Sequence, residues 1–191
     1  MADVILKAEH LKIGFFSERH SLFEKRKRNE VLKDLSFTME KGEVLGLVGE
    51  SGCGKSTLAK VILGLLKPDS GTVIVSGNRP QMVFQDPSDS FSPRMKVKDI
   101  LCEPLANYGL IKPAEKAAKA HELLKMVELP EEFADRYPRS MSGGQKQSVG
   151  IARALALEPE ILICDEATSA LDVSVQQSIV ELLVKLQQEK H

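Results

Sequence analysis

The chain has 191 residues, of which 42% are hydrophobic and 28% are charged, and its formal net charge at pH 7 is -1. These values are typical of a globular protein with one domain, or with one domain and a subdomain. The near-neutral charge gives no reason to expect a nucleic-acid partner, and no run approaches the roughly 18 apolar residues that span a membrane.

The N-terminus lacks the apolar region of a signal peptide, so we expect a cytoplasmic protein. Cys53, Cys102 and Cys164 share no C-x-x-C spacing, which suggests neither a disulfide framework nor a zinc site. Reduced thiols fit the cytosol.

Two extended segments are predicted first, over residues 3–13 and 31–39, and the second shows clear alternation at Leu35, Phe37 and Met39. Phe15 and Phe16 follow the first segment. Aromatic residues at a strand end usually belong to the core, yet one of these two could stack on an adenine through its flat face.

A glycine-rich loop comes next, between a predicted strand and a predicted helix. Residues 49–56 fit G-x-x-x-x-G-K-[ST], after an apolar run over 44–48 and before helical spacing over 58–65. In such a loop, backbone N–H groups surround a polyphosphate, Lys55 reaches its β and γ phosphates, and the Ser56 hydroxyl suits Mg²⁺. The alternative is a turn that only connects the two elements. The predicted nucleotide-binding residues are Gly49, Glu50, Ser51, Gly52, Cys53, Gly54, Lys55, Ser56 and Thr57.

A short strand is predicted over 73–75, followed by an apolar strand over 82–84 that ends on Gln85. Ligands bind at the carboxyl ends of strands in α/β sheets. Gln85 is therefore a candidate to meet Mg²⁺ or a γ phosphate.

Residues 88–139 show helical patterns without intervening strands, broken by several prolines. We expect this block to be a helical subdomain inserted into an α/β core. In that interpretation residues 1–191 form one domain, whose nucleotide-binding core comprises residues 1–87 and 140–191.

The turn Ser142-Gly143-Gly144-Gln145 precedes another predicted helix. Its N–H groups and hydroxyl could form a second anion site, although an ordinary helix N-cap explains the same residues. A second phosphate site in a protein with a single phosphate loop suggests that two protein molecules bind each nucleotide between them.

An apolar run over 161–164 ends on Asp165 and Glu166. A carboxylate at the end of a buried strand is costly unless it meets a cation, so Asp165 fits a Mg²⁺ ligand. Glu166 can orient an attacking water or accept its proton. The alternative is a pair of helix-capping acids. A turn over 169–172 then leads into a final helix.

These stretches, in this order, resemble the ATP-binding subunit of ABC transporters. Residues 49–56 resemble the Walker A loop, Gln85 the Q-loop, 142–145 the signature, 161–166 the Walker B strand with its catalytic glutamate, and 169–172 the D-loop. The residues after Gln85 and after Glu166 look like those of the dipeptide, oligopeptide and nickel importer group.

The resemblance implies an α/β P-loop NTPase fold with an antiparallel β edge and an inserted helical subdomain. It implies ATP hydrolysis with Lys55, Gln85 and Glu166 as catalytic residues, and Mg²⁺ held by Ser56, Gln85 and Asp165. Asp172 and the signature would complete the nucleotide site.

The implied partners are transmembrane permease subunits and a second ATP-binding subunit, either identical or related. An extracytoplasmic solute-binding protein would act indirectly. The implied location is the cytoplasmic face of the membrane, with a soluble protein when isolated. The competing functions are a soluble ABC ATPase that acts on DNA or ribosomes, and a non-hydrolysing regulatory subunit.

The chain departs from the family pattern in several places. Met141 replaces the usual leucine, Lys146 and Ser148 stand where arginines are frequent, and the span 75–85 is short. The chain also ends before the family's C-terminal strand and switch histidine, a role that His191 comes too early to fill. We therefore expect either a fragment or a protein with impaired hydrolysis.

Overall fold

The computed structural model describes residues 3–16, 28–77, 80–84, 90–167 and 171–190. Contacts divide the chain into two compact units, Met1–Pro80 and Gln81–His191, and each is described here by itself. The predicted division, with a core of residues 1–87 and 140–191 and a helical subdomain of residues 88–139, differs from these two units and stays a prediction.

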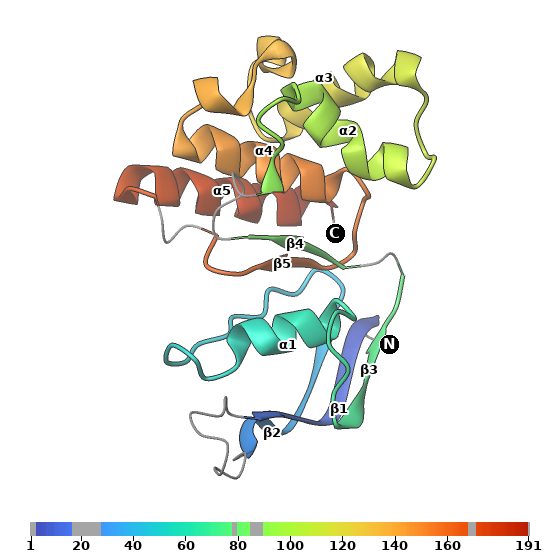
Figure 1. Ribbon diagram of the computed structural model, residues 1–191, viewed down its shortest axis with the longest axis vertical. Coiled ribbons are helices and arrows are strands. Elements are labelled where there is room, and N and C mark those ends of the chain that lie inside the picture. The colour runs from blue at the N-terminus through green and yellow to red at the C-terminus, as the bar shows by residue number, and fades with distance from the viewer. Residues whose placement is uncertain (1–2, 17–27, 78–79, 85–89, 168–170, 191) are drawn as a thin grey trace, which may run out of the picture. The chain divides into compact units, whose positions relative to one another are not determined.

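The first unit is built on an antiparallel sheet with strand order β2-β1-β3 (Figure 1). Its strands are β1 (Val4–Phe16), β2 (Arg28–Glu40) and β3 (Ser70–Val75). Ala8, on the central strand, pairs with Phe37 of β2 and with Val73 of β3. Leu6 and Ala8 enter the core with the period of two of a strand, and so do Leu11 and Ile13 after a register shift between Ala8 and Leu11. The predicted antiparallel edge is confirmed.

Helix α1 (Lys55–Ile62) packs against this sheet through one apolar face. Leu58, Ala59, Val61 and Ile62 are its buried side chains, at the spacing that places them on one side of a helix. The predicted helix after the glycine-rich loop is confirmed.

The strand predicted over 44–48 is wrong for this structure. Residues 43–50 form neither strand nor helix, and Val44 and Val48 are 77% and 99% exposed. A hydrophobic run becomes a strand only where a neighbouring strand pairs with its backbone. In the first unit β1 is paired on both sides by β2 and β3, and 44–48 joins neither of those outer strands.

The second unit contains a parallel pair of short strands and most of the helices. Strands β4 (Gln81–Val83) and β5 (Leu162–Cys164) pair with Met82 opposite Ile163. In Figure 1 the helices of this unit lie to one side of that pair. They are α2 (Val97–Asn107), α3 (Lys116–Met126), α4 (Gly143–Leu155) and α5 (Val173–Lys190), with 3-10 turns η2 (Pro113–Glu115), η3 (Glu131–Asp135) and η4 (Pro138–Ser140).

The core of the second unit lies between α2, α3 and α4. Leu101, Leu123, Leu124 and Ile151 are almost fully buried there. The predicted helical character of residues 88–139 is thus confirmed for the part that the structure describes. Among all the residues that the structure describes, no helix is both long and apolar enough to cross a membrane.

We expect Leu101→Ala to lower the free energy of unfolding by about 2–5 kcal/mol, because Leu101 is 0% exposed and its removal leaves a cavity. Urea unfolding would measure the change. The matched control is Leu110→Ala, at a site that is 65% exposed, where we expect a change within about 0.5 kcal/mol. Equal losses in the two variants would contradict the position of this core.

Candidate functional site

The glycine-rich loop turns sharply into α1 at Gly54. Its φ is 110°, a left-handed value that glycine adopts without strain. A Cβ at Gly54 would also lie only 2.8 Å from a methyl carbon of Val31. The backbone therefore needs glycine at this position to bring the loop onto the first turn of α1.

Lys55 folds back over the same loop. Its Nζ donates to the carbonyl oxygens of Gly49 at 2.7 Å and of Glu50 at 3.0 Å. The ammonium group thus lies against the loop backbone, next to the positive end of α1. An ammonium and a helix N-terminus at one loop form a suitable environment for a polyphosphate.

The aromatic residues at the end of β1 are not core residues. Phe15 and Phe16 are 43% and 61% exposed, and the Arg28 guanidinium lies 5.9 Å from the centre of the Phe16 ring. Their exposed faces are compatible with stacking on an adenine, which stays a prediction.

In the second unit β4 and β5 run parallel, so their carboxyl ends lie at the same edge of the pair. The Asp165 N–H donates to the Val83 carbonyl at 3.2 Å, which extends the pairing by one residue. Glu166 follows with φ of 50°, in the left-handed region that few non-glycine residues occupy. Four other non-glycine residues, His10, Asp34, Glu128 and Glu158, have positive φ as well, so the role of Glu166 stays a prediction. Gln85 lies outside the described residues.

The signature-like turn caps α4. The Gln145 N–H donates to the Ser142 hydroxyl at 3.3 Å, and the Ser142 N–H donates to the Gln145 side chain at 3.0 Å. This reciprocal pair is a capping box, as the ordinary N-cap alternative requires. Gly143 and Gly144 form the first turn of the helix, and their role as an anion site stays a prediction.

The first turns of α4 and α5 touch. A Cβ at Gly144 would lie 2.5 Å from a methyl carbon of Val175, so only glycine fits there. Asp172 caps α5, since its carboxylate accepts from the Ser174 hydroxyl at 2.7 Å and from the Val175 N–H at 3.0 Å. These hydrogen bonds lower the pKa of Asp172. Its predicted contact with nucleotide is not tested.

The predicted metal ligands are Ser56, Gln85 and Asp165. Their hydroxyl, amide and carboxylate oxygens are donors that Mg²⁺ accepts. Over the described ranges, no three His, Cys, Asp or Glu side chains are placed to hold a metal ion. Gln85 lies outside those ranges, and the Mg²⁺ site stays a prediction.

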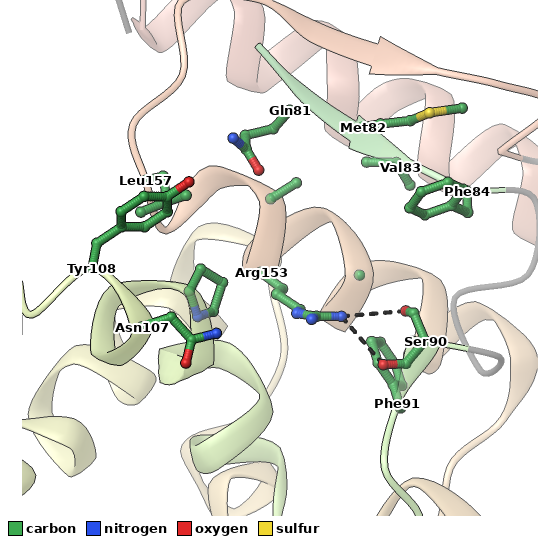
Figure 2. A pocket seen from close by; sticks show the side chains of 13 residues that line it. Gln81, Met82, Val83, Phe84, Ser90, Phe91, Asn107, Tyr108, Arg153 and Leu157 are labelled. Carbon is green, nitrogen blue, oxygen red and sulfur yellow. Dashed lines mark hydrogen bonds between the residues drawn. The ribbon is translucent and has the colours of Figure 1, made fainter. Parts of the chain in front are cut away.

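Two polar residues of α4 escaped the sequence analysis. Gln147 is 1% exposed, and Arg153 forms an ion pair with Glu103 of α2. The available signal was a glutamine and an arginine close to the apolar residues Val149, Ile151 and Ala152 in the same predicted helix. Arg153 borders a cavity of about 390 Å³, which also lies beside Phe84, Ser90 and Tyr108 (Figure 2).

This chain is similar in sequence to ATP-binding proteins of ABC transporters. Residues 32–169 match the family model described as "ABC transporter". The oligopeptide transport ATP-binding protein OppF of Bacillus subtilis is 44% identical, over 100% of this chain and 66% of that protein. A probable peptide ABC transporter ATP-binding protein of Sinorhizobium fredii, y4tS, is 45% identical over 99% of this chain and 58% of that protein. The chain therefore spans about three fifths of the length of these relatives.

Solved structures show the same fold. The dimeric, post-hydrolysis ATP-binding cassette MJ0796 bound to ADP and Pi aligns with a TM-score of 0.79 at 31% identity, over 96% of this chain and 83% of that chain. CbiO1 of Clostridium perfringens, part of the ABC transporter complex cbiONQ, aligns with a TM-score of 0.78 at 30% identity, covering 98% and 75%.

We expect a thiol alkylator such as iodoacetamide to modify Cys53 first and Mg·ATP to slow that reaction. Cys53 is exposed, and its Sγ is 4.0 Å from the Lys55 Nζ. Cys102 is buried, and desolvation raises the pKa of Cys164 to about 11, so its thiol stays protonated although the residue is exposed. Mass spectrometry would measure alkylation at each cysteine, with Cys102 and Cys164 as internal controls. Equal Cys53 alkylation rates with and without ATP would contradict a nucleotide at this loop.

Proposed function

The chain belongs to the ABC transporter family, and we propose that it binds Mg·ATP and hydrolyses it to power the import of peptides through membrane permease subunits. Peptides are favoured over nickel because relatives that match nearly the whole chain are named for peptide transport. Those names also favour a transporter subunit over a soluble ATPase acting on DNA or ribosomes, and over a regulatory subunit.

The phosphate loop is the observation that carries this proposal. Gly54 directs the loop onto α1, and Lys55 lies over its carbonyl oxygens at 2.7 Å and 3.0 Å. A nucleotide's β and γ phosphates would exchange these carbonyl partners of Lys55 for anionic oxygens, which form stronger hydrogen bonds with an ammonium group.

Hydrolysis would then require a group that activates water and a bound Mg²⁺. Glu166 would orient the attacking water and accept its proton, as a carboxylate within reach of a hydroxyl can do. Ser56, Gln85 and Asp165 would hold Mg²⁺, which would neutralise charge that develops on the phosphate oxygens.

The proposed assembly contains a second ATP-binding subunit, identical or related, and permease subunits. Residues 142–145 and Asp172 would face the phosphate loop of the second subunit, and the block 88–139 would contact the permease. The location would be the cytoplasmic face of the membrane, with an extracytoplasmic solute-binding protein as an indirect partner.

Calorimetric titration of Mg·ATP tests the loop. We expect saturable binding in the parent chain and a loss of affinity of roughly 10- to 100-fold in Lys55→Ala, because a charge-assisted hydrogen bond to phosphate disappears. Lys60→Ala is the matched control, since Lys60 is an exposed lysine on the same helix. Equal affinities in the two variants would remove Lys55 from the nucleotide site.

Phosphate release tests the glutamate. We expect Glu166→Gln to lower turnover by roughly 10²- to 10⁴-fold while ATP affinity stays within about twofold, because the amide keeps the shape but accepts no proton. Glu160→Gln, at an exposed glutamate just before β5, should leave turnover unchanged. Undiminished hydrolysis in Glu166→Gln would show that another group activates the water.

A further inference from the structure

The end of β1 presents two aromatic side chains on opposite faces of the sheet. Ile13 is buried, so the period of two along a strand places Phe15 on the core face and Phe16 on the outer face. We propose that Arg28 and Asp69 are positioning residues, which hold this strand end so that Phe15 stacks on the base of a bound nucleotide. The inference rests on the proposed function, because it assigns a place to the base of the same nucleotide.

The core face at this end of β1 is also the face of the phosphate loop. Ile13 pairs with Leu32 of β2, and a Cβ at Gly54 would lie 3.2 Å from a methyl carbon of Leu32. Gly54 therefore approaches the sheet beside this pair of residues. Phe15 follows Ile13 on the same face after about 7 Å of extended strand. An exposed ring at this place can stack on a base while the loop binds the phosphates.

Asp69, directly before β3, joins the end of β1 to its two neighbouring strands. Its carboxylate oxygen Oδ2 accepts a hydrogen bond from the Gly14 N–H at 2.8 Å and forms an ion pair with the Arg28 guanidinium. The Asp69 N–H in turn donates to the Lys12 carbonyl oxygen at 2.8 Å. Hydrogen bonds to an ionised carboxylate are stronger than those between neutral groups. The backbone directly before Phe15 is therefore held by contacts on both sides of the carboxylate residue.

Arg28 holds the same strand end from the outer face. It pairs with Phe16 across β1 and β2, and its guanidinium carbon lies 5.9 Å from the centre of the Phe16 ring, within the range of a cation–π contact. The ion pair with Asp69 keeps the guanidinium at this position. Because Phe16 is held on one face of the sheet, the adjacent Phe15 keeps its direction on the other.

Stability alone does not explain this arrangement. The side chains of Arg28 and Asp69 are 45% and 44% exposed, and both aromatic rings are exposed. An ion pair this exposed adds little to the free energy of unfolding, and an exposed ring buries little apolar area. A ring that is already ordered in solvent, however, loses less conformational entropy when a ligand stacks on it. The network is therefore better explained by binding than by folding.

Calorimetric titration with two ligands tests the proposal. Mg·ATP carries a base, whereas Mg·tripolyphosphate offers the phosphates alone. We expect Phe15→Ala to lower ATP affinity about tenfold, because base stacking is lost, and Arg28→Met to lower it about threefold, because the ring is then ordered only on binding. Tripolyphosphate affinity should stay within twofold in both variants. Lys33→Met, at an exposed cation on the same strand, is the matched control and should change neither affinity.

A double-mutant cycle separates positioning from a direct contact. If Arg28 acts through Phe15, Arg28→Met should have no further effect on ATP affinity in a Phe15→Ala background. Asp69→Asn keeps an acceptor for the Gly14 N–H but loses the charge, so it should repeat the effect of Arg28→Met and replaces that variant if it does not fold. Additive effects in the double variant, or unchanged ATP affinity in both single variants, would overturn the proposal.

The two ligands also separate this inference from the proposed function. Equal losses of ATP and tripolyphosphate affinity in Arg28→Met would reveal a purely structural role and overturn the positioning role. Unchanged ATP affinity in Phe15→Ala, with tripolyphosphate still bound, would overturn the place of the base and leave the phosphate loop intact. A parent chain that binds neither ligand would refute the proposed function itself, and this inference with it.

Discussion

The second unit depends on the burial of one helix. Helix α4 packs against α2, α3, α5 and β4, and its residues Val149, Ile151 and Ala152 are at most 1% exposed. Apolar burial of this extent is the dominant favourable contribution to folding, and the close packing of such a core resists displacement. The turn 142–145 therefore begins a helix that the core of its unit holds on several sides.

Short sequence patterns were enough to predict several helices, strands and caps of this protein. The G-x-x-x-x-G-K-[ST] spacing indicated both the loop and α1, and the extended segments predicted over 3–13 and 31–39 correspond to strands β1 and β2. The capping residues of α4 were also readable, because Ser142 and Gln145 act within a single turn. For the loop, α1 and the α4 cap, the hydrogen bonds that form the structure join residues close in the sequence, whereas the pairing of β1 with β2 joins residues such as Val4 and Glu40.

Features that depend on distant partners were not predictable in the same way. The run 44–48 has a strand composition, but composition does not say which strand pairs with it, and in this structure neither β2 nor β3 does. Gln147 and Arg153 become informative only when Phe84 and Ser90, some 60 positions earlier, are seen beside them. The left-handed backbone at Glu166 likewise follows from how the chain leaves β5, which residue type alone would disfavour.

The contact between Gly144 and Val175 has a mechanical consequence. The space between Gly144 and Val175 admits the glycine hydrogen but no methyl group, so the first turns of α4 and α5 are in direct contact. Each start is also closed by its own cap, Ser142 on one helix and Asp172 on the other. A displacement of the first turn of α5 toward α4 would therefore press directly on the first turn of α4, which begins at the Ser142 cap.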